Sequence, residues 1–201
     1  MENIKVIACG LFQANAYIIT KDKHALVIDP GTAHSNIFAY LEDNSLIVDG
    51  IFLTHAHFDH IGGVDKLVAK YNCPLYMNEY DAPLLTSYEL NCSLEGRQVI
   101  VKSKPKFIKP GLNEIGVFGI EIIDAPGHSE GCSMLRYENN LFTGDVLFKN
   151  CIGRTDLKGS SNTKMNNSLK MIRNMEDDYI VYPGHGEATT LKEEQKNNPY
   201  L

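Results

Sequence analysis

The stretch His55-Ala56-His57-Phe58-Asp59-His60 places three histidines and one aspartate within six positions. It follows the apolar run Gly-Ile-Phe-Leu-Thr at 50–54, which is typical of a strand, and it precedes Ile-Gly-Gly at 61–63. Residues two apart on an extended backbone point to the same side, so His55 and His57 can bind one metal ion. Asp59 and His60 lie past the bend and could bind a second ion. A histidine cluster in a solvated loop is the alternative, but this spacing is that of a metal site.

The length and composition are those of an ordinary globular protein. The 201 residues suffice for one domain with a substantial core, and 43% are hydrophobic and 22% charged. The net charge of −6 disfavours a nucleic-acid partner, which needs a basic surface. No apolar run approaches the roughly 18 residues of a membrane span, so no membrane partner is expected. Five scattered cysteines without a Cys-x-x-Cys pair favour free thiols in a reducing compartment, and the expected location is cytoplasmic.

Strand-like and helix-like patterns interleave along the chain, which indicates an α/β or α+β fold with helices covering sheets. Helices are predicted over 37–41, 64–71, 79–90 and 165–175. Strands are predicted over 17–19, 25–28, 51–54, 75–77, 99–101, 118–123, 134–137, 141–143 and 180–182.

Ligand-type residues follow four of the predicted strands through short turns that contain Gly or Thr. They are His55, His128, Asp145 and His185. Loops held by a rigid sheet are where binding groups collect. A single Pro-Gly-His is more often a plain turn. Together with the hexapeptide, however, these positions supply five His and two Asp, which suffices for two metal ions with an open position for water. Imidazole and carboxylate together suit zinc, iron or manganese.

The order of these motifs resembles the metallo-β-lactamase superfamily. The motifs are His-x-His-x-Asp-His, Gly-His at 127–128, Thr-Gly-Asp at 143–145 and Pro-Gly-His-Gly at 183–186. The chain is most similar to small single-domain proteins related to glyoxalase II (hydroxyacylglutathione hydrolase), over almost its whole length. The resemblance implies a four-layer αβ/βα sandwich of two mixed β-sheets flanked by helices. It also implies one metallo-β-lactamase domain over 1–201, without the C-terminal glutathione-binding helical domain of glyoxalase II.

The resemblance assigns a role to each ligand-type residue. The first of two divalent ions, with zinc favoured over iron or manganese, would be bound by His55, His57 and His128. The second would be bound by Asp59, His60 and His185, with Asp145 bridging the two. Asp59 would also act in catalysis, by orienting a hydroxide. Asp29 would either support the site without binding metal or simply form a turn.

The implied activity is metal-dependent hydrolysis of a small-molecule thioester, S-lactoylglutathione or a related acyl-thiol. Two metal ions can lower the pKa of a water held between them towards ~7, and the resulting hydroxide would attack the carbonyl. Arg154 is the candidate substrate-binding residue, because a guanidinium binds a carboxylate bidentately, but a pairing with Asp156 is equally open. Glyoxalase II has aromatic residues where this chain has Thr155-Asp156, which leaves the thiol carrier open. The alternatives are a persulfide dioxygenase using one iron, or a hydrolase of another ester or lactone.

Overall fold

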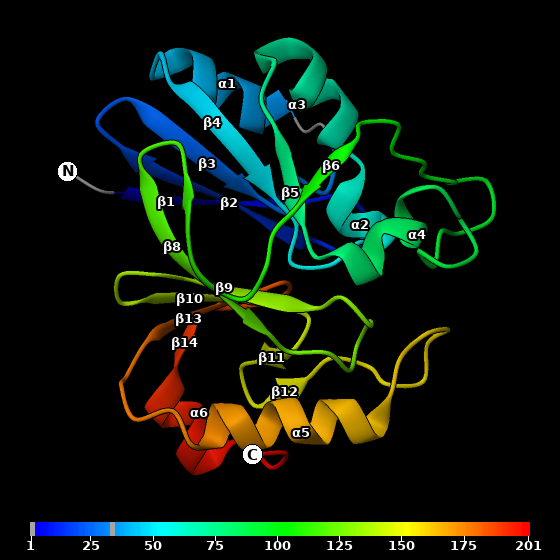
Figure 1. Cartoon of the computed structure of the whole chain (residues 1–201), viewed down its shortest axis with the longest axis vertical. Helices are drawn as coiled ribbons and strands as arrows, with labels where there is room; N and C mark the ends of the chain where they lie inside the picture. Colours follow the sequence, from blue (N-terminus) through cyan, green and yellow to red (C-terminus); the bar gives the residue numbers. More distant parts are fainter. Residues whose placement is uncertain (1–2, 33–34) are drawn as a thin grey trace.

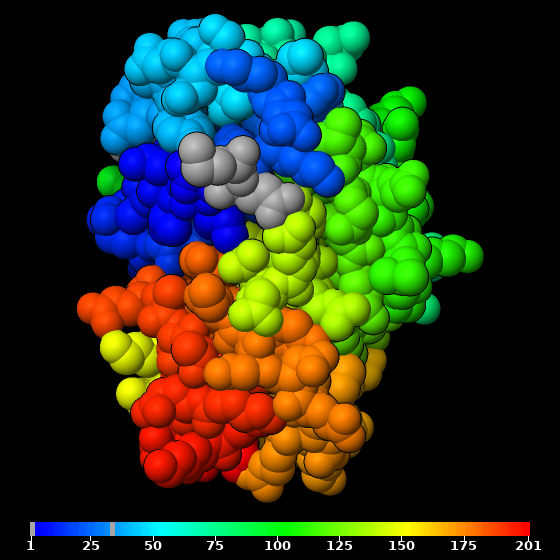
Figure 2. All heavy atoms as spheres, turned by 90° about the vertical axis from the view of Figure 1, so that its left-hand side faces the viewer, coloured from blue at the N-terminus to red at the C-terminus, as the bar shows by residue number. Residues whose placement is uncertain are grey.

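Two six-stranded sheets lie face to face, and helices cover the outer face of each sheet (Figure 1). The computed structural model describes residues 3–32 and 35–201. The first sheet is built by residues 3–107 and the second by residues 111–190. Figure 2 shows the same division on the surface, with the N-terminal residues in blue and cyan above the C-terminal residues in orange and red.

The first sheet has the strand order β1-β2-β3-β4-β5-β6. β1, β2 and β3 pair antiparallel, whereas β3 to β6 pair parallel. Parallel neighbours need a crossover, and helices α1 and α3 provide two of these crossovers. The strands are β1 (Asn3–Cys9), β2 (Ala14–Lys21), β3 (His24–Ile28), β4 (Ile47–Phe52), β5 (Leu75–Met77) and β6 (Pro105–Phe107). The helices are α1 (Ser35–Asp43), α2 (Phe58–Ile61), α3 (Val64–Tyr71), the 3₁₀ turn η1 (Glu79–Asp81) and α4 (Ala82–Leu85).

The second sheet has the order β14-β13-β10-β9-β8-β7. Its strands pair antiparallel except β10 and β13, which are parallel, so both sheets are mixed. The strands are β7 (Gly111–Ile115), β8 (Phe118–Asp124), β9 (Ser133–Tyr137), β10 (Asn140–Gly144), β13 (Ile180–Pro183) and β14 (Thr189–Thr190). A separate hairpin pairs β11 (Leu147–Phe148) with β12 (Cys151–Ile152). The covering helices are α5 (Asn162–Arg173) and α6 (Leu191–Asn197).

Three apolar layers separate these four structural layers. One lies between the first sheet and its helices and includes Ile37, Leu41, Ile51 and Leu67. The central layer lies between the sheets and includes Tyr17, Phe52, Phe118 and Phe142. The third lies between the second sheet and α5 and includes Leu141, Met165, Leu169 and Ile172. The predicted four-layer sandwich is therefore confirmed.

The side-chain alternation of β2 explains how one strand contributes to two of these layers. Ile18 packs towards the helices, while Tyr17 and Ile19 pack between the sheets. Successive strand residues point to opposite faces, so a strand covered on both sides is apolar at every position. Within residues 3–32 and 35–201, no helix combines the length and the apolar character that crossing a membrane requires.

Two predicted elements are wrong. The helix expected over 79–90 is only η1 followed by the single turn α4. Beyond it, the Asn91 amide donates to the carbonyls of Leu84 and Val99, and the Ser87 hydroxyl accepts from Leu90 N. Such side-chain bonds to the backbone compete with a helix. The strand expected over 99–101 joins no sheet, and Val101 N donates instead to Leu85 O at the end of α4.

Candidate metal centre

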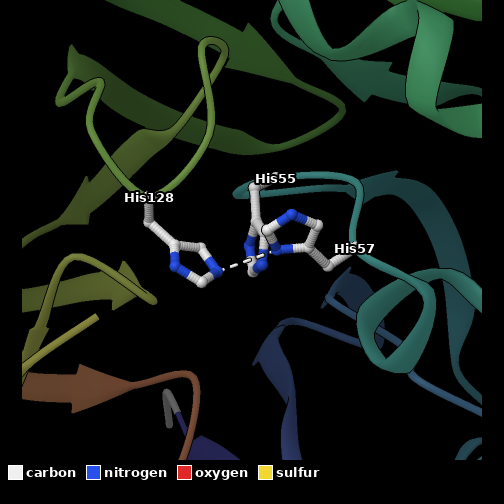
Figure 3. A group of neighbouring side chains, drawn as sticks. All are labelled: His55, His57 and His128. Atoms are coloured by element: carbon white, nitrogen blue, oxygen red, sulfur yellow. Dashed lines mark hydrogen bonds between the residues drawn. The ribbon is translucent and has the colours of Figure 1, made fainter. Parts of the chain in front are cut away.

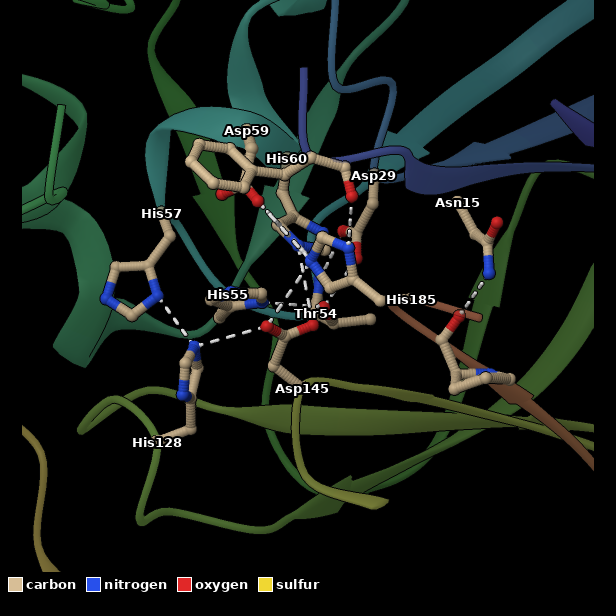
Figure 4. Close-up of polar contacts among 12 residues, drawn as sticks. Asn15, Asp29, Thr54, His55, His57, Asp59, His60, His128, Asp145 and His185 are labelled. Carbon is tan, nitrogen blue, oxygen red and sulfur yellow. Dashed lines mark hydrogen bonds and ion pairs between the residues drawn. The ribbon is translucent and has the colours of Figure 1, made fainter. Parts of the chain in front are cut away.

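The seven ligand-type residues converge at one edge of the two sheets, although they come from four separate segments (Figure 4). His55 and His57 follow β4, and Asp59 and His60 lie on α2. The remaining three follow strands of the second sheet: His128 follows β8, Asp145 follows β10, and His185 follows β13. The expected placement of ligand-type residues just beyond strand ends is therefore what the fold has.

The first cluster consists of the buried histidines His55, His57 and His128 (Figure 3). One ring nitrogen from each lies within 4.8 Å of the others, and His57 Nδ1 is 2.8 Å from His128 Nε2. The buried His55 Nε2 contacts no hydrogen-bond partner in the described chain. A buried polar atom without a partner is costly, unless an ion satisfies it.

The second cluster consists of Asp59, His60 and His185, whose ligand atoms also lie within 4.8 Å of one another. His185 Nε2 is 3.3 Å from both His60 Nε2 and Asp59 Oδ2. One carboxylate and two imidazoles make this cluster more negative than the first. That composition suits a divalent cation with oxygen and nitrogen ligands.

Asp145 lies between the two clusters. Its Oδ1 is 3.4 Å from His60 Nε2, and its Oδ2 is 3.4 Å from His128 Nε2 and 3.6 Å from His185 Nε2. Oδ1 is buried without a hydrogen-bond partner among the described residues. Gly184 allows this approach, because a Cβ there would lie 2.0 Å from Oδ1. The carboxylate therefore faces both clusters, as a bridging ligand would.

The outer nitrogens of three histidines contact oxygen atoms. His60 Nδ1 lies 3.1 Å from Asp29 Oδ2 and His128 Nδ1 lies 2.9 Å from Arg154 O. Likewise, His185 Nδ1 lies 3.0 Å from Phe12 O. An N–H that donates to each oxygen makes Nε2 the nitrogen that faces the centre, and a bound ion would displace any proton from Nε2. Metal-binding histidines show this arrangement, so the residues present fit a pair of divalent ions.

Asp29 supports the centre from outside it. Its Oδ1 accepts a 2.8 Å bond from Thr54 N and its Oδ2 a 2.6 Å bond from the Thr54 hydroxyl, beside the contact with His60. Its φ of 46° lies in the left-handed region that Asp tolerates better than most residues. Asp29 therefore contacts a ligand-type residue, as the supporting role requires, while no hydrogen-bonded turn is present at Asp29 itself.

The protonation of the two clusters differs because their neighbours differ. Burial, together with nearby His128, lowers the pKa of His57 to about 3, and burial with His60 and His57 lowers the pKa of His55 as well. Burial alone would also lower the pKa of His60, but Asp59 and Asp145 outweigh it and raise that pKa to about 10. His55 and His57 therefore stay neutral at pH 7, the form that binds a metal ion.

A cavity of about 360 Å³ opens onto the ligand-type residues. Its other walls are mostly apolar and are formed by Phe12, Phe58, Cys92, Leu94 and Leu157. The rings of Phe12 and Phe58 contact edge to face, with centroids 5.7 Å apart. This lining suits an uncharged part of a substrate next to the metal ligands.

Arg154 also lines this cavity, at its exposed rim. Its guanidinium contacts Asp156 in a bidentate pair, with Nε 2.9 Å from Oδ1 and Nη2 3.0 Å from Oδ2. Of the two alternatives left open, the local pairing is therefore present in this structure. A substrate carboxylate would have to compete with Asp156 for the same nitrogens.

Two polar residues next to the centre were not anticipated. Asn15 lies at the start of β2 and donates to the carbonyls of Pro183 and Gly186, on either side of His185 (Figure 4). Asp81 is buried and accepts bonds from the segments that carry the first cluster. Neither lies in a motif, and Asp81 fell inside the wrongly predicted helix.

Comparison with known proteins agrees with this geometry. Residues 9–185 match the family described as the metallo-beta-lactamase superfamily. The probable metallo-hydrolase YqgX of Bacillus subtilis is 37% identical over 96% of this chain and 94% of its own. The hydroxyacylglutathione hydrolase GloC of Haemophilus influenzae is 33% identical over 99% of this chain and 98% of its own.

Solved structures agree as well. The B3 metallo-beta-lactamase BLEG-1 has a TM-score of 0.94 at 36% identity, covering 99% of both chains. TTHA1623 in a di-iron-bound form has a TM-score of 0.87 at 32% identity, covering 98% of this chain and all of the other. The motifs, the four-layer fold and the matched residues lead to one conclusion: this chain belongs to the metallo-beta-lactamase superfamily.

Proposed function

We propose that this protein is a dinuclear metal-dependent hydrolase that cleaves a small-molecule thioester of the hydroxyacylglutathione type. The observation that carries the proposal is the pair of clusters around Asp145, whose carboxylate faces both. His55, His57 and His128 would hold one ion, and Asp59, His60 and His185 the other. Bound there, two divalent ions would supply a nucleophile at neutral pH and polarise a carbonyl group.

The Asp59 carboxylate would orient the attacking water while it binds the second ion. Burial raises its pKa, but His60 and His185 outweigh burial and hold the pKa below its usual range. Asp59 is therefore ionised at neutral pH. It also lines the cavity, where a substrate would lie. An ionised carboxylate at that position can accept a hydrogen bond from the water and so orient it.

The leaving group and the cavity support a thioester as the substrate class. A thiolate is a weak base and leaves without a strong general acid. This suits a cavity whose lining consists of metal-ligand-type residues and mostly apolar side chains. GloC, a relative over nearly the whole chain, is named for hydrolysis of hydroxyacylglutathione. The Arg154 guanidinium is paired with Asp156 and is therefore not free to bind a carboxylate of glutathione. S-lactoylglutathione is thus the first substrate to test, and the thiol carrier is left open.

The test combines metal analysis with turnover. We expect two metal ions per purified chain, hydrolysis of S-lactoylglutathione or a related acyl-thiol, and loss of turnover after chelation. The variants His57→Ala and Asp59→Ala should abolish turnover, while the control His24→Ala should retain it, because His24 pairs with Asp49 away from the centre.

Three outcomes would contradict the proposal. Normal turnover in His57→Ala would refute the metal assignment. One iron per chain with oxygen uptake would indicate a persulfide dioxygenase instead. Turnover of thiol-free esters or lactones, with none of thioesters, would move the protein to another class of hydrolase.

A further inference from the structure

Asp81 is a buried carboxylate that touches none of the seven ligand-type residues directly, yet contacts both segments of the first cluster. Its Oδ2 accepts a 3.0 Å bond from Ala56 N and a 2.7 Å bond from the Ser129 hydroxyl. Its Oδ1 accepts a 2.6 Å bond from Gly131 N. All three partners donate, which an ionised carboxylate can satisfy with its several lone pairs.

Two of the partners of Asp81 lie directly beside histidines of the first cluster in the sequence. Ala56 lies between His55 and His57, and Ser129 directly follows His128. The first two histidines follow a strand of the first sheet, whereas His128 follows a strand of the second. One side chain thus joins the two halves of the fold at the point where they must share a metal ion.

The fit around Asp81 is close on the side of the second sheet. A Cβ on Gly131 would lie 2.6 Å from Asp81 N and 2.7 Å from its Oδ1, so a side chain there would separate the segments. One backbone bond, from Ser133 N to Thr54 O at 2.9 Å, also joins the same segments. That bond lies before His55 in one segment and after His128 in the other. It therefore constrains the imidazole rings less directly than Asp81 does.

The second cluster has different supports. His60 contacts Asp29, and His185 contacts Phe12 O through its outer nitrogen. The side-chain hydrogen bonds of Asp81 in the described chain run to the His55–His57 and His128–Gly131 segments, not to these residues. A change at Asp81 should therefore affect one cluster and spare the other.

We propose that Asp81 is a positioning residue for the first metal ion: it fixes the distance between the His55–His57 segment and His128, and thereby sets the affinity of that cluster alone. The proposal rests on the proposed function in so far as both clusters bind metal. Loss of a residue that orients metal ligands typically weakens metal affinity by about 10- to 100-fold.

The test is the variant Asp81→Asn, in which an amide replaces one acceptor oxygen by a donor and so loses at least one N–H bond. Asp65→Asn is the matched control. The Asp65 carboxylate also accepts two backbone N–H bonds and one serine hydroxyl, from Lys102 and Ser103, but these lie in a loop away from the centre. Both proteins are titrated with Zn²⁺ against a competing chelator, and the two binding constants are compared with those of the wild type. His128→Ala and His185→Ala identify which constant belongs to which cluster.

We expect Asp81→Asn to weaken the first-cluster constant about 10- to 100-fold and to leave the second unchanged, with both unchanged in Asp65→Asn. Equal weakening of both constants, or of neither, would overturn the inference. If Asp81→Asn fails to fold, Ser129→Ala removes one of the three bonds and should weaken the same constant by a smaller factor; an unchanged constant there would also overturn it. A wild-type chain that binds no Zn²⁺, Fe²⁺ or Mn²⁺ would refute the proposed function itself, whereas two bound ions with an insensitive Asp81→Asn would refute only this inference.

Discussion

Replacement of Asn15 by alanine should loosen the loop that carries His185. The Asn15 amide is buried and donates to Pro183 O at 3.1 Å and to Gly186 O at 2.9 Å. The two acceptors lie on either side of His185 in the sequence, so the amide fixes the loop at both ends. Alanine removes both donors and leaves the backbone bond from residue 15 to Gly184 O in place.

The magnitude follows from what each acceptor retains. Pro183 O still accepts the Tyr17 hydroxyl at 2.5 Å, while Gly186 is exposed, so water can replace the Asn15 donor at its carbonyl. The variant loses two hydrogen bonds but leaves no deeply buried acceptor without a partner. Such a loss lowers the free energy of unfolding by about 1–2 kcal/mol. For a chain of this size, that loss lowers the Tm by roughly 2–8 °C.

Urea unfolding and Zn²⁺ titration together test this prediction. The second-cluster constant should weaken about 10- to 100-fold, because His185 loses a support of its loop. Asn113→Ala is the control, since the Asn113 amide also donates to two carbonyls, of Lys109 and Gly111, but in the β7 turn. Unchanged stability and unchanged metal affinity in Asn15→Ala would refute the reasoning. Equal metal effects in both variants would show that the loop contact has no special role.

Three further predictions concern the core, the thiols and the rim. Phe142→Ala empties a fully buried site between the sheets and should cost about 3–5 kcal/mol in urea unfolding. Burial raises the pKa of Cys73 from 9.0 to about 11. The thiol therefore ionises more readily in the unfolded chain, and the free energy of unfolding falls as the pH rises from 9 to 11. Between pH 8 and 10 under reducing conditions, the free energy of unfolding should therefore fall by about 1 kcal/mol more in the wild type than in Cys73→Ala; equal losses would contradict this. Asp156→Ala frees the Arg154 guanidinium and should lower KM for a thioester whose carrier bears a carboxylate, without changing kcat; an unchanged KM would exclude Arg154 from binding that carboxylate.

The local sequence pattern predicts a helix or strand correctly where the burial of that one element sets the pattern. In β2, alternate side chains pack on opposite faces of the strand. In α3 and α5, the buried residues recur every three to four positions, and these periods can be read directly from the sequence. The segment 79–101 was misjudged because Asn91 and Ser87 bond the backbone there, and such contacts have no period. Its apolar residues still suggested a helix and a strand.

The sequence by itself displayed the seven ligand-type residues, because His-x-His-x-Asp-His and the turns before His128, Asp145 and His185 are local features. The resemblance carried by these motifs implied the four-layer sandwich. Their convergence at one edge agrees with that prediction, while metal binding by each residue stays a prediction. Only the tertiary structure decided how the ligands are supported: Asn15 contacts a carbonyl 171 residues away, and Asp81 one amide 50 residues away. It also decided that Arg154 is engaged by Asp156 rather than free. Contacts between segments so distant along the chain depend on how two sheets pack, and packing leaves no mark on the spacing of the residues that it brings together.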